Sequence, residues 1–372
     1  MAFESLVVGL SIIIAGILSV EFGVSVAILE IIAGLFVASY FDISGLSWLD
    51  FLSNFGILGI MFIAGFEIDR DVLKRYYKRS LAIGLTAYFI PFALISLASY
   101  LAFGFDVKPS LLIGLATSTT SLALVYPALK EKHLFRVKTG HILLSSAMVV
   151  DLLSIVSLTL LFGLLDISLL IYILVAVVLL FMAPRIGRWL FSKYKGNIVE
   201  LEMKFILFVL LSLAVISEKI YASEVIFVFI AGLFFSALLK QHTILEEKLR
   251  GIIFGFMAPL FFFKAGTMIN LKVADLTVLI ISLVILLLAL FSKFIATYSV
   301  VKKVCRPRFA SFAGLLFNYR LTFGIIASVF GLRYGVINEG IYFALMSTIL
   351  LTSIAASILL RRFQHVTPTE LE

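Results

Sequence analysis

The sequence predicts an all-α polytopic membrane protein with about 13 transmembrane helices. Of its 372 residues, 62% are hydrophobic and only 14% are charged, and the mean hydropathy is +1.16. A soluble protein needs a larger polar shell to cover its core. Apolar runs of about 17 to 25 residues, the length of a membrane-spanning helix, recur along most of the chain. The net charge of +8 is therefore expected from basic loops on one side of a membrane, not from nucleic-acid binding.

Apolar runs between polar breaks define the predicted helices in order. Their approximate ranges are 4–20, 23–40, 53–67, 80–104, 109–129, 139–164, 167–187, 203–218, 223–240, 251–270, 274–300, 309–332 and 338–360. The single Cys305 excludes an internal disulfide. The N-terminal segment lacks the basic leader and small-residue cleavage pattern of a signal peptide.

The basic residues test this helix count. The odd-numbered loops and the tail contain 22 of them, whereas the even-numbered loops contain only Lys108, Lys219, Lys272 and Arg333. Cytoplasmic loops carry an excess of Lys and Arg, and a missed or invented helix would scramble the alternation. The sequence therefore predicts a multi-pass protein of the cell membrane with its N-terminus outside and its C-terminus in the cytoplasm.

A few charged residues fall inside the predicted spans or near their ends. Each costs roughly 2.5 to 3.5 kcal/mol at the centre of a membrane helix, so such residues are candidates for function. The acids are Asp151, Glu30 and Glu67, and the bases are Lys264, Lys293 and Arg320.

The helix at 109–129 shows signs of an interruption. Five consecutive hydroxyl residues, 117–121, lie between Gly114 and Pro127. Hydroxyl side chains can bond carbonyls released by an unwound turn, or can coordinate a cation. Ordinary packing of Ser and Thr between membrane helices is the alternative for any one of them.

The helix at 309–332 places Asn318 and Arg320 at mid-depth, which indicates a second interruption. Two broken helices in corresponding halves of a chain are typical of transporters with inverted repeats. The halves would be about 1–164 and 203–362, joined by a linker helix at 167–187.

Several segments resemble, in order, the motifs of the monovalent cation:proton antiporter-2 family, which comprises Na⁺/H⁺ and K⁺/H⁺ exchangers with an NhaA-like fold. The most specific resemblance is "NFGILGIMFIAGFEIDRDVLKR" (54–75), which is similar to the family's third-helix signature. The others are "ILEIIAGLFVA" (28–38), "TTSLAL" (119–124), "APLFFFKAGTMINL" (258–271), "LALFSKFIATY" (288–298) and "LLFNYRLTFGIIA" (315–327). Many family members add a cytosolic regulatory domain. We expect none here, only a short cytoplasmic tail at 363–372 after a transmembrane antiporter domain at 1–362.

The resemblance implies that Asp151 is the ligand of the monovalent cation and the carrier of the proton. Desolvation favours the protonated form of a buried carboxyl group, whereas an arriving cation favours the ionised form. The same oxygen atoms can therefore hold H⁺ or a desolvated Na⁺ or K⁺ in turn. Thr119, Thr120 and Ser121 are the expected neighbouring ligands, because hydroxyl oxygens suit such a cation. A structural salt bridge is the alternative role for Asp151.

The resemblance also implies supporting roles. Lys293 matches a family lysine that pairs with the ion-site acid, although a lysine that reaches the membrane interface is the alternative. Arg320, with Asn318 nearby, matches a family arginine that holds unwound backbone or the C-terminus of a half-helix. Glu30 and Glu67 match supporting acids.

Three positions depart from the family pattern. Val150 removes the first polar ligand of the ion-site pair, and Thr322 replaces a family Glu. Lys264 stands where members have a small or apolar residue, so it either pairs with an acid or places positive charge near the site. A single carboxylate suggests exchange of one cation for one proton without net charge movement, provided that Lys293 does not titrate.

Other functions remain open at this stage. A cation channel, a carrier of another solute on the same fold and a non-transporting sensor are the alternatives within this architecture. An enzyme is disfavoured, because the sequence lacks H-E-x-x-H and G-x-S-x-G motifs and membrane-protease aspartate pairs. No cofactor is expected. The expected partners are Na⁺ or K⁺, H⁺, the lipid bilayer and a second copy in a homodimer.

Overall fold

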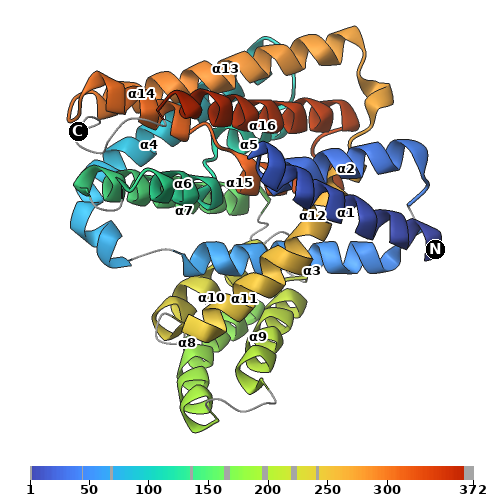
Figure 1. Ribbon diagram of the computed structural model, residues 1–372, viewed down its shortest axis with the longest axis vertical. Helices are drawn as coiled ribbons and strands as arrows, with labels where there is room; N and C mark the ends of the chain where they lie inside the picture. Colours follow the sequence, from blue (N-terminus) through green and yellow to red (C-terminus); the bar gives the residue numbers. More distant parts are fainter. Residues whose placement is uncertain are drawn as a thin grey trace. The chain divides into compact units, whose positions relative to one another are not determined.

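The computed structural model describes residues 2–43, 45–67, 70–134, 137–162, 168–194, 200–218, 224–239 and 243–363. Throughout these ranges the regular elements are helices (Figure 1). The all-α prediction is therefore confirmed for this part of the chain. The last nine residues of the predicted tail, 364–372, lie outside the described residues.

The helices follow one another with short connections. In chain order they are α1 (Ala2–Phe22), α2 (Val26–Tyr40), α3 (Ser47–Phe66), α4 (Arg70–Leu101), α5 (Val107–Ser118), α6 (Leu122–Glu131), α7 (Lys138–Phe162), α8 (Ser168–Lys193), α9 (Leu201–Glu218), α10 (Glu224–Leu239), α11 (Thr243–Ile252), the π-helix η2 (Ile253–Met257), α12 (Ala258–Thr267), the 3₁₀ turn η3 (Leu271–Val273), α13 (Leu276–Val301), α14 (Pro307–Leu316), α15 (Leu321–Arg333), α16 (Glu339–Leu360) and the 3₁₀ turn η4 (Arg361–Phe363).

The predicted ranges fall on these helices, but α3 begins six residues earlier than predicted, at Ser47, and α8 ends six residues later, at Lys193. Helix α4 begins at Arg70 rather than near residue 80, because a basic segment that reads as a loop continues the helix across a kink at Tyr76 (φ −115°, ψ 15°). The predicted helix at 251–270 is formed by the end of α11, the π-helix and α12 in succession.

Eight helical segments of the described chain are long and apolar enough to cross a membrane, and α2 and Phe227–Ser236 are shorter apolar helices. The protein is therefore a multi-pass membrane protein. The predicted number of 13 crossings is not confirmed and remains a prediction.

One compact unit comprises Ile43–Asp69 and Phe162–Lys264. Its centre is the pair α3 and α10, which approach closely enough for backbone contact. A Cβ added to Gly65 would overlap the Phe229 carbonyl group, and one added to Gly232 would overlap the Phe62 carbonyl group. Small residues permit such close approach between membrane helices, where dispersion contacts take the place of the hydrophobic effect.

The other compact unit comprises Ala2–Asp42, Arg70–Leu161 and Ala265–Glu372. Here α4 packs on α5 and α13, and α13 also packs on α14 and α16 (Figure 1). Helix α15 packs on α5 and α16, and its residues from Leu321 to Gly331 are all buried. Helix α15, which follows the second predicted break, therefore lies in the interior of this unit.

Candidate functional site

The first interruption lies between α5 and α6. Helix α5 ends at Ser118 and α6 begins at Leu122, and the three residues between them are not helical. Thr119 is extended (φ −64°, ψ 161°), and so is Ser121 (φ −86°, ψ 110°). All the hydroxyl residues from Thr117 to Ser121 are buried. The predicted break is present at the predicted residues.

The second interruption lies between α14 and α15. Helix α14 ends at Leu316 and α15 begins at Leu321, and Arg320 occupies the N-cap position of α15 (φ −129°, ψ 22°). Asn318 and Arg320 are fully buried. A buried helix end leaves carbonyl and N–H groups without helical partners, and these must be satisfied by other groups.

The two interruptions meet and are joined by hydrogen bonds, and we call this meeting point the crossing. The backbone N–H of Ser121 donates to the carbonyl oxygen of Tyr319 at 2.7 Å. The Thr120 hydroxyl donates to the carbonyl oxygen of Phe317 at 3.3 Å. The hydroxyl oxygens of Ser121 and Thr322 lie 2.8 Å apart. Unwound backbone in a membrane protein is tolerated where it is satisfied inside the protein, as it is at this crossing.

Lys293 of α13 caps the buried C-terminal end of α5. Its side chain is 0% exposed, and its ammonium group donates to the carbonyl oxygen of Ser118, the last residue of α5. A cation is favourable at a helix C-terminus because the final carbonyl groups carry partial negative charge. The Lys293 side chain is therefore bonded inside the protein and does not extend to its surface.

Arg320 is held by backbone and amide oxygens. Its Nη2 atom donates to the Ala289 carbonyl of α13 at 2.6 Å and to Asn318 Oδ1 at 3.0 Å. The amide nitrogen of Asn318 donates in turn to the Gly314 carbonyl at 2.9 Å. Within the described part of the chain, the Nε and Nη1 groups of Arg320 have no hydrogen-bond partner. The guanidinium group therefore retains hydrogen-bonding capacity inside the protein.

Asp151 lies on α7 in the same compact unit, and its side chain is 2% exposed. The preceding Val150 is fully buried. The Lys293 ammonium group interacts electrostatically with two charged groups, attracted by Asp151 and repelled by Arg320. The structure thus brings together one acid, two bases and the end of a broken helix. Two of the three charges come from α7 and α13, which are far apart in sequence.

Two other candidates form ion pairs in the first compact unit. Lys264 lies 2.6 Å from the Asp50 carboxylate of α3, so the alternative that it pairs with an acid is the one observed. Glu67 lies 2.7 Å from Arg250, which also contacts Glu246 at 3.0 Å.

Glu30 lies in the second compact unit with Asp151, on α2, and is 2% exposed. Glu67 and Lys264 belong to the first compact unit, whereas the crossing belongs to the second.

Several groups at the site carry no sequence signal. The carbonyl groups of Ser118, Ala289 and Tyr319 act through the backbone, so residue type does not reveal them. Away from the site, Asp50 could have been identified from the sequence as a partner for Lys264, because it is an acid in the first turn of an otherwise apolar helix. Tyr88 of α4 is fully buried with its hydroxyl near Ser118 and Ser157, but an aromatic residue in an apolar helix is more often a packing residue.

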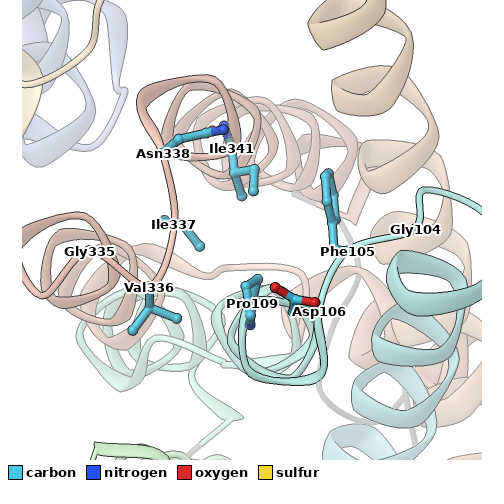
Figure 2. A pocket seen from close by; sticks show the side chains of 9 residues that line it. All are labelled: Gly104, Phe105, Asp106, Pro109, Gly335, Val336, Ile337, Asn338 and Ile341. Carbon is cyan, nitrogen blue, oxygen red and sulfur yellow. The ribbon is translucent and has the colours of Figure 1, made fainter.

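A cavity lies at the opposite ends of α5 and α15 from the crossing. It has a volume of about 390 Å³ and is lined by the turns before α5 and after α15. Figure 2 shows Asp106 and Pro109 on one side of it and Asn338 and Ile341 on the other. Between cavity and crossing, the half-helices are tightly packed, because a Cβ added to Gly331 would overlap the Leu112 side chain.

The sequence is similar to those of several known antiporters. The chain is 27% identical over 325 residues to a Methanocaldococcus jannaschii protein named "Probable Na(+)/H(+) antiporter 3", covering 84% of this chain and 83% of that protein. It is 25% identical to a Na(+)/H(+) antiporter of Enterococcus hirae, covering 93% of each. It is 29% identical to Cation/H(+) antiporter 17 of Arabidopsis thaliana, but covers only 40% of that protein.

The fold matches a solved structure along its whole length. The sodium proton antiporter MjNhaP1 from Methanocaldococcus jannaschii superimposes with a TM-score of 0.70 at 14% identity, covering 100% of this chain and 99% of that one. The profile of the family described as "Sodium/hydrogen exchanger, transmembrane" matches residues 9–364. The chain therefore belongs to the sodium/hydrogen exchanger family of transmembrane transporters.

Proposed function

We propose that the protein exchanges a monovalent cation, Na⁺ or K⁺, for H⁺ across the cell membrane, with Asp151 as the shared binding group. The observation that carries this proposal is the buried Asp151 carboxyl group, within electrostatic range of a lysine bonded to the end of a broken helix. The names of the relatives, which are Na⁺/H⁺ and cation/H⁺ antiporters, support the same conclusion.

Competition at one carboxyl group couples the two ions. In a buried site the proton is favoured by desolvation, whereas a cation that has lost its water is favoured by the ionised carboxylate. Binding of one ion therefore expels the other. In this proposal the hydroxyl oxygens of Thr119, Thr120 and Ser121 replace part of the hydration shell of the cation.

The charges of the site favour electroneutral exchange. In this proposal Lys293 and Arg320 each carry one positive charge, and Asp151 carries one negative charge when ionised. A proton and a monovalent cation that replace each other on Asp151 leave the total charge of the site unchanged. This stoichiometry of one to one requires that Lys293 keeps its proton throughout the cycle.

We also propose alternating access through inverted repeats. The halves are about 1–164 and 203–362 with a linker at 167–187, and thirteen crossings place the N-terminus outside and the C-terminus in the cytoplasm. In this assignment α5–α6 corresponds to α14–α15, and the crossing of the two interruptions supports that correspondence. Rocking of one repeat against another around a fixed site is the usual consequence. A homodimer is proposed from family likeness.

Purified protein in liposomes tests the function. The lumen contains a pH-sensitive dye, and Na⁺, K⁺ or choline is added outside. We expect proton movement with Na⁺ or K⁺ but not with choline, and its loss in Asp151→Asn. The matched control is Asp275→Asn, because Asp275 caps α13 with a 2.8 Å bond from the Val278 N–H and Asn also caps helices well. Wild-type exchange by Asp151→Asn would refute the assignment, and cation current without proton coupling would indicate a channel.

A further inference from the structure

A second polar cavity lies in the same compact unit as the crossing, with a volume of about 260 Å³. Its lining includes two basic side chains, Lys132 and Arg361, and two hydroxyl side chains, Tyr319 and Ser357. Among the described residues that line it there is no carboxylate. The wall of the cavity therefore contains two basic side chains and two hydroxyl groups.

The two basic residues are positioned by local structure. Lys132 is the C-cap of α6, where a cation is favoured by the partial negative charge of the helix end. Arg361 follows α16, and its Nη2 atom donates to the Phe22 carbonyl at 2.8 Å. The adjacent Gly23 has φ +61°, and a Cβ added there would lie 3.4 Å from the same Nη2 atom. The turn between α1 and α2 thus holds the guanidinium group at the cavity.

The hydroxyl groups connect the cavity to the crossing. Ser357 donates to the Tyr319 hydroxyl at 3.3 Å. Tyr319 is the residue whose carbonyl group accepts the Ser121 N–H that joins the two interruptions. A molecule in the cavity would therefore touch the side chain of a residue whose backbone belongs to the candidate ion site.

We propose that this cavity binds a phosphate-bearing anion, either the headgroup of an anionic lipid or a free phosphate compound. A guanidinium fork matches the paired oxygens of phosphate, and an ammonium group adds a mobile point charge. The volume lies just below the range of roughly 300 to 1,000 Å³ typical of drug-sized ligands, which suits a headgroup. Basic pockets between membrane helices at the membrane surface are the usual binding sites of anionic headgroups.

Ligand-dependent thermal stability tests the proposal on the full chain purified in detergent. The midpoint of unfolding is measured against inorganic phosphate at constant ionic strength, and in micelles doped with phosphatidylglycerol or with phosphatidylcholine. A ligand that binds the folded state raises the midpoint. We expect Lys132→Gln and Arg361→Gln each to weaken the apparent affinity by roughly tenfold. Lys130→Gln and Arg362→Gln are the matched controls, since both residues are exposed and neither lines the cavity.

The results distinguish a lipid headgroup from a free phosphate compound, and they show whether the proposal fails. Stabilisation by phosphatidylglycerol alone identifies a lipid site, whereas stabilisation by inorganic phosphate identifies a site for a free compound. Equal weakening in all four variants would show a diffuse basic surface and would overturn the proposal. Absence of stabilisation by either ligand would overturn it as well. Because Arg361→Gln also removes the bond to Phe22, Lys132→Gln decides the result if the arginine variant is unstable.

Discussion

The backbone N–H of Ser121 donates a 2.7 Å hydrogen bond to the carbonyl oxygen of Tyr319, and this bond joins two helix interruptions that are almost two hundred residues apart in sequence. Both partners are main-chain atoms in a buried place. Each interruption therefore satisfies a polar group that the other leaves without a helical partner. The side chains around the bond remain available for chemistry, and the predictions below separate these two roles.

Lys293→Met should lower both stability and the rate of exchange. The substitution keeps the length of the side chain but leaves the Ser118 carbonyl oxygen without its donor, which costs about 1 to 3 kcal/mol for a buried group. It also removes the positive charge that acts on Asp151, so the pH profile of exchange should shift. Both effects are measured in liposomes across a pH series and by thermal unfolding.

Lys302→Met is the control for this prediction, because Lys302 lies at the end of the same helix and is exposed. A variant at 293 with the wild-type pH profile would show that Lys293 is only a structural donor.

Substitutions at Ser121 and Thr322 distinguish a contribution to stability from a contribution to cation binding. Ser121→Ala and Thr322→Val each remove the same 2.8 Å contact, so each should cost about 1 kcal/mol of stability. Of these two residues, Ser121 is proposed as a cation ligand and Thr322 is not. We therefore expect the cation KM to rise severalfold in Ser121→Ala and to stay near the wild-type value in Thr322→Val. Equal KM values in the two variants would remove Ser121 from the ligand set.

The ion pair between Lys264 and Asp50 should contribute little to stability and nothing to ion affinity. The side chains are 21% and 48% exposed, and an exposed pair contributes about 0.2 to 1 kcal/mol. A double-mutant cycle with Lys264→Met and Asp50→Asn measures this coupling. Cation KM should be unchanged in all three variants. Tighter cation binding by Lys264→Met would instead mean that its charge acts on the ion site.

Gly65→Ala should destabilise the pair α3 and α10, because its Cβ has no space against the Phe229 carbonyl group. We expect a loss of about 1 to 3 kcal/mol, as is usual when a well-packed contact is overfilled. Gly16→Ala is the matched control, since no atom lies within 4 Å of a Cβ added at that position on α1. The control should be neutral or slightly stabilising, because Ala is favoured over Gly in helices by about 0.5 to 1 kcal/mol. Thermal unfolding of the two variants side by side decides the prediction.

The sequence predicted much of the fold because membrane solvation imposes strong patterns on it. Long apolar runs locate the helices, and a dense run of hydroxyls or a buried Arg marks an interruption. The start of α4 was predicted wrongly, because charge alone does not distinguish a basic loop from a basic helical extension. Within the site, Lys293 and Arg320 were identified as buried bases. Their partners were not, since the carbonyl groups of Ser118 and Ala289 are common to every residue type.

Some residue roles at the candidate site come from the family resemblance, and others come from the contacts in the structure. The role proposed for Asp151 comes from the resemblance, and the structure adds the burial of its side chain and its electrostatic link to Lys293. The pairing of Lys264 with Asp50 needed the structure, because two alternatives fitted the sequence equally well. Arg320 was expected to hold unwound backbone or the C-terminus of a half-helix, and it donates to Asn318 within the interruption and to the Ala289 carbonyl group of α13. That bond ties the second interruption to the helix that carries Lys293.

The shortest of the three bonds across the crossing joins main-chain atoms only, so apart from proline at 121 it does not depend on which amino acids occupy positions 121 and 319. A relative with other side chains at 119–121 can keep this bond and alter the oxygen atoms offered to an ion. Selectivity and architecture can therefore diverge separately, and laboratory selection for a new cation has a short, defined stretch of sequence to vary.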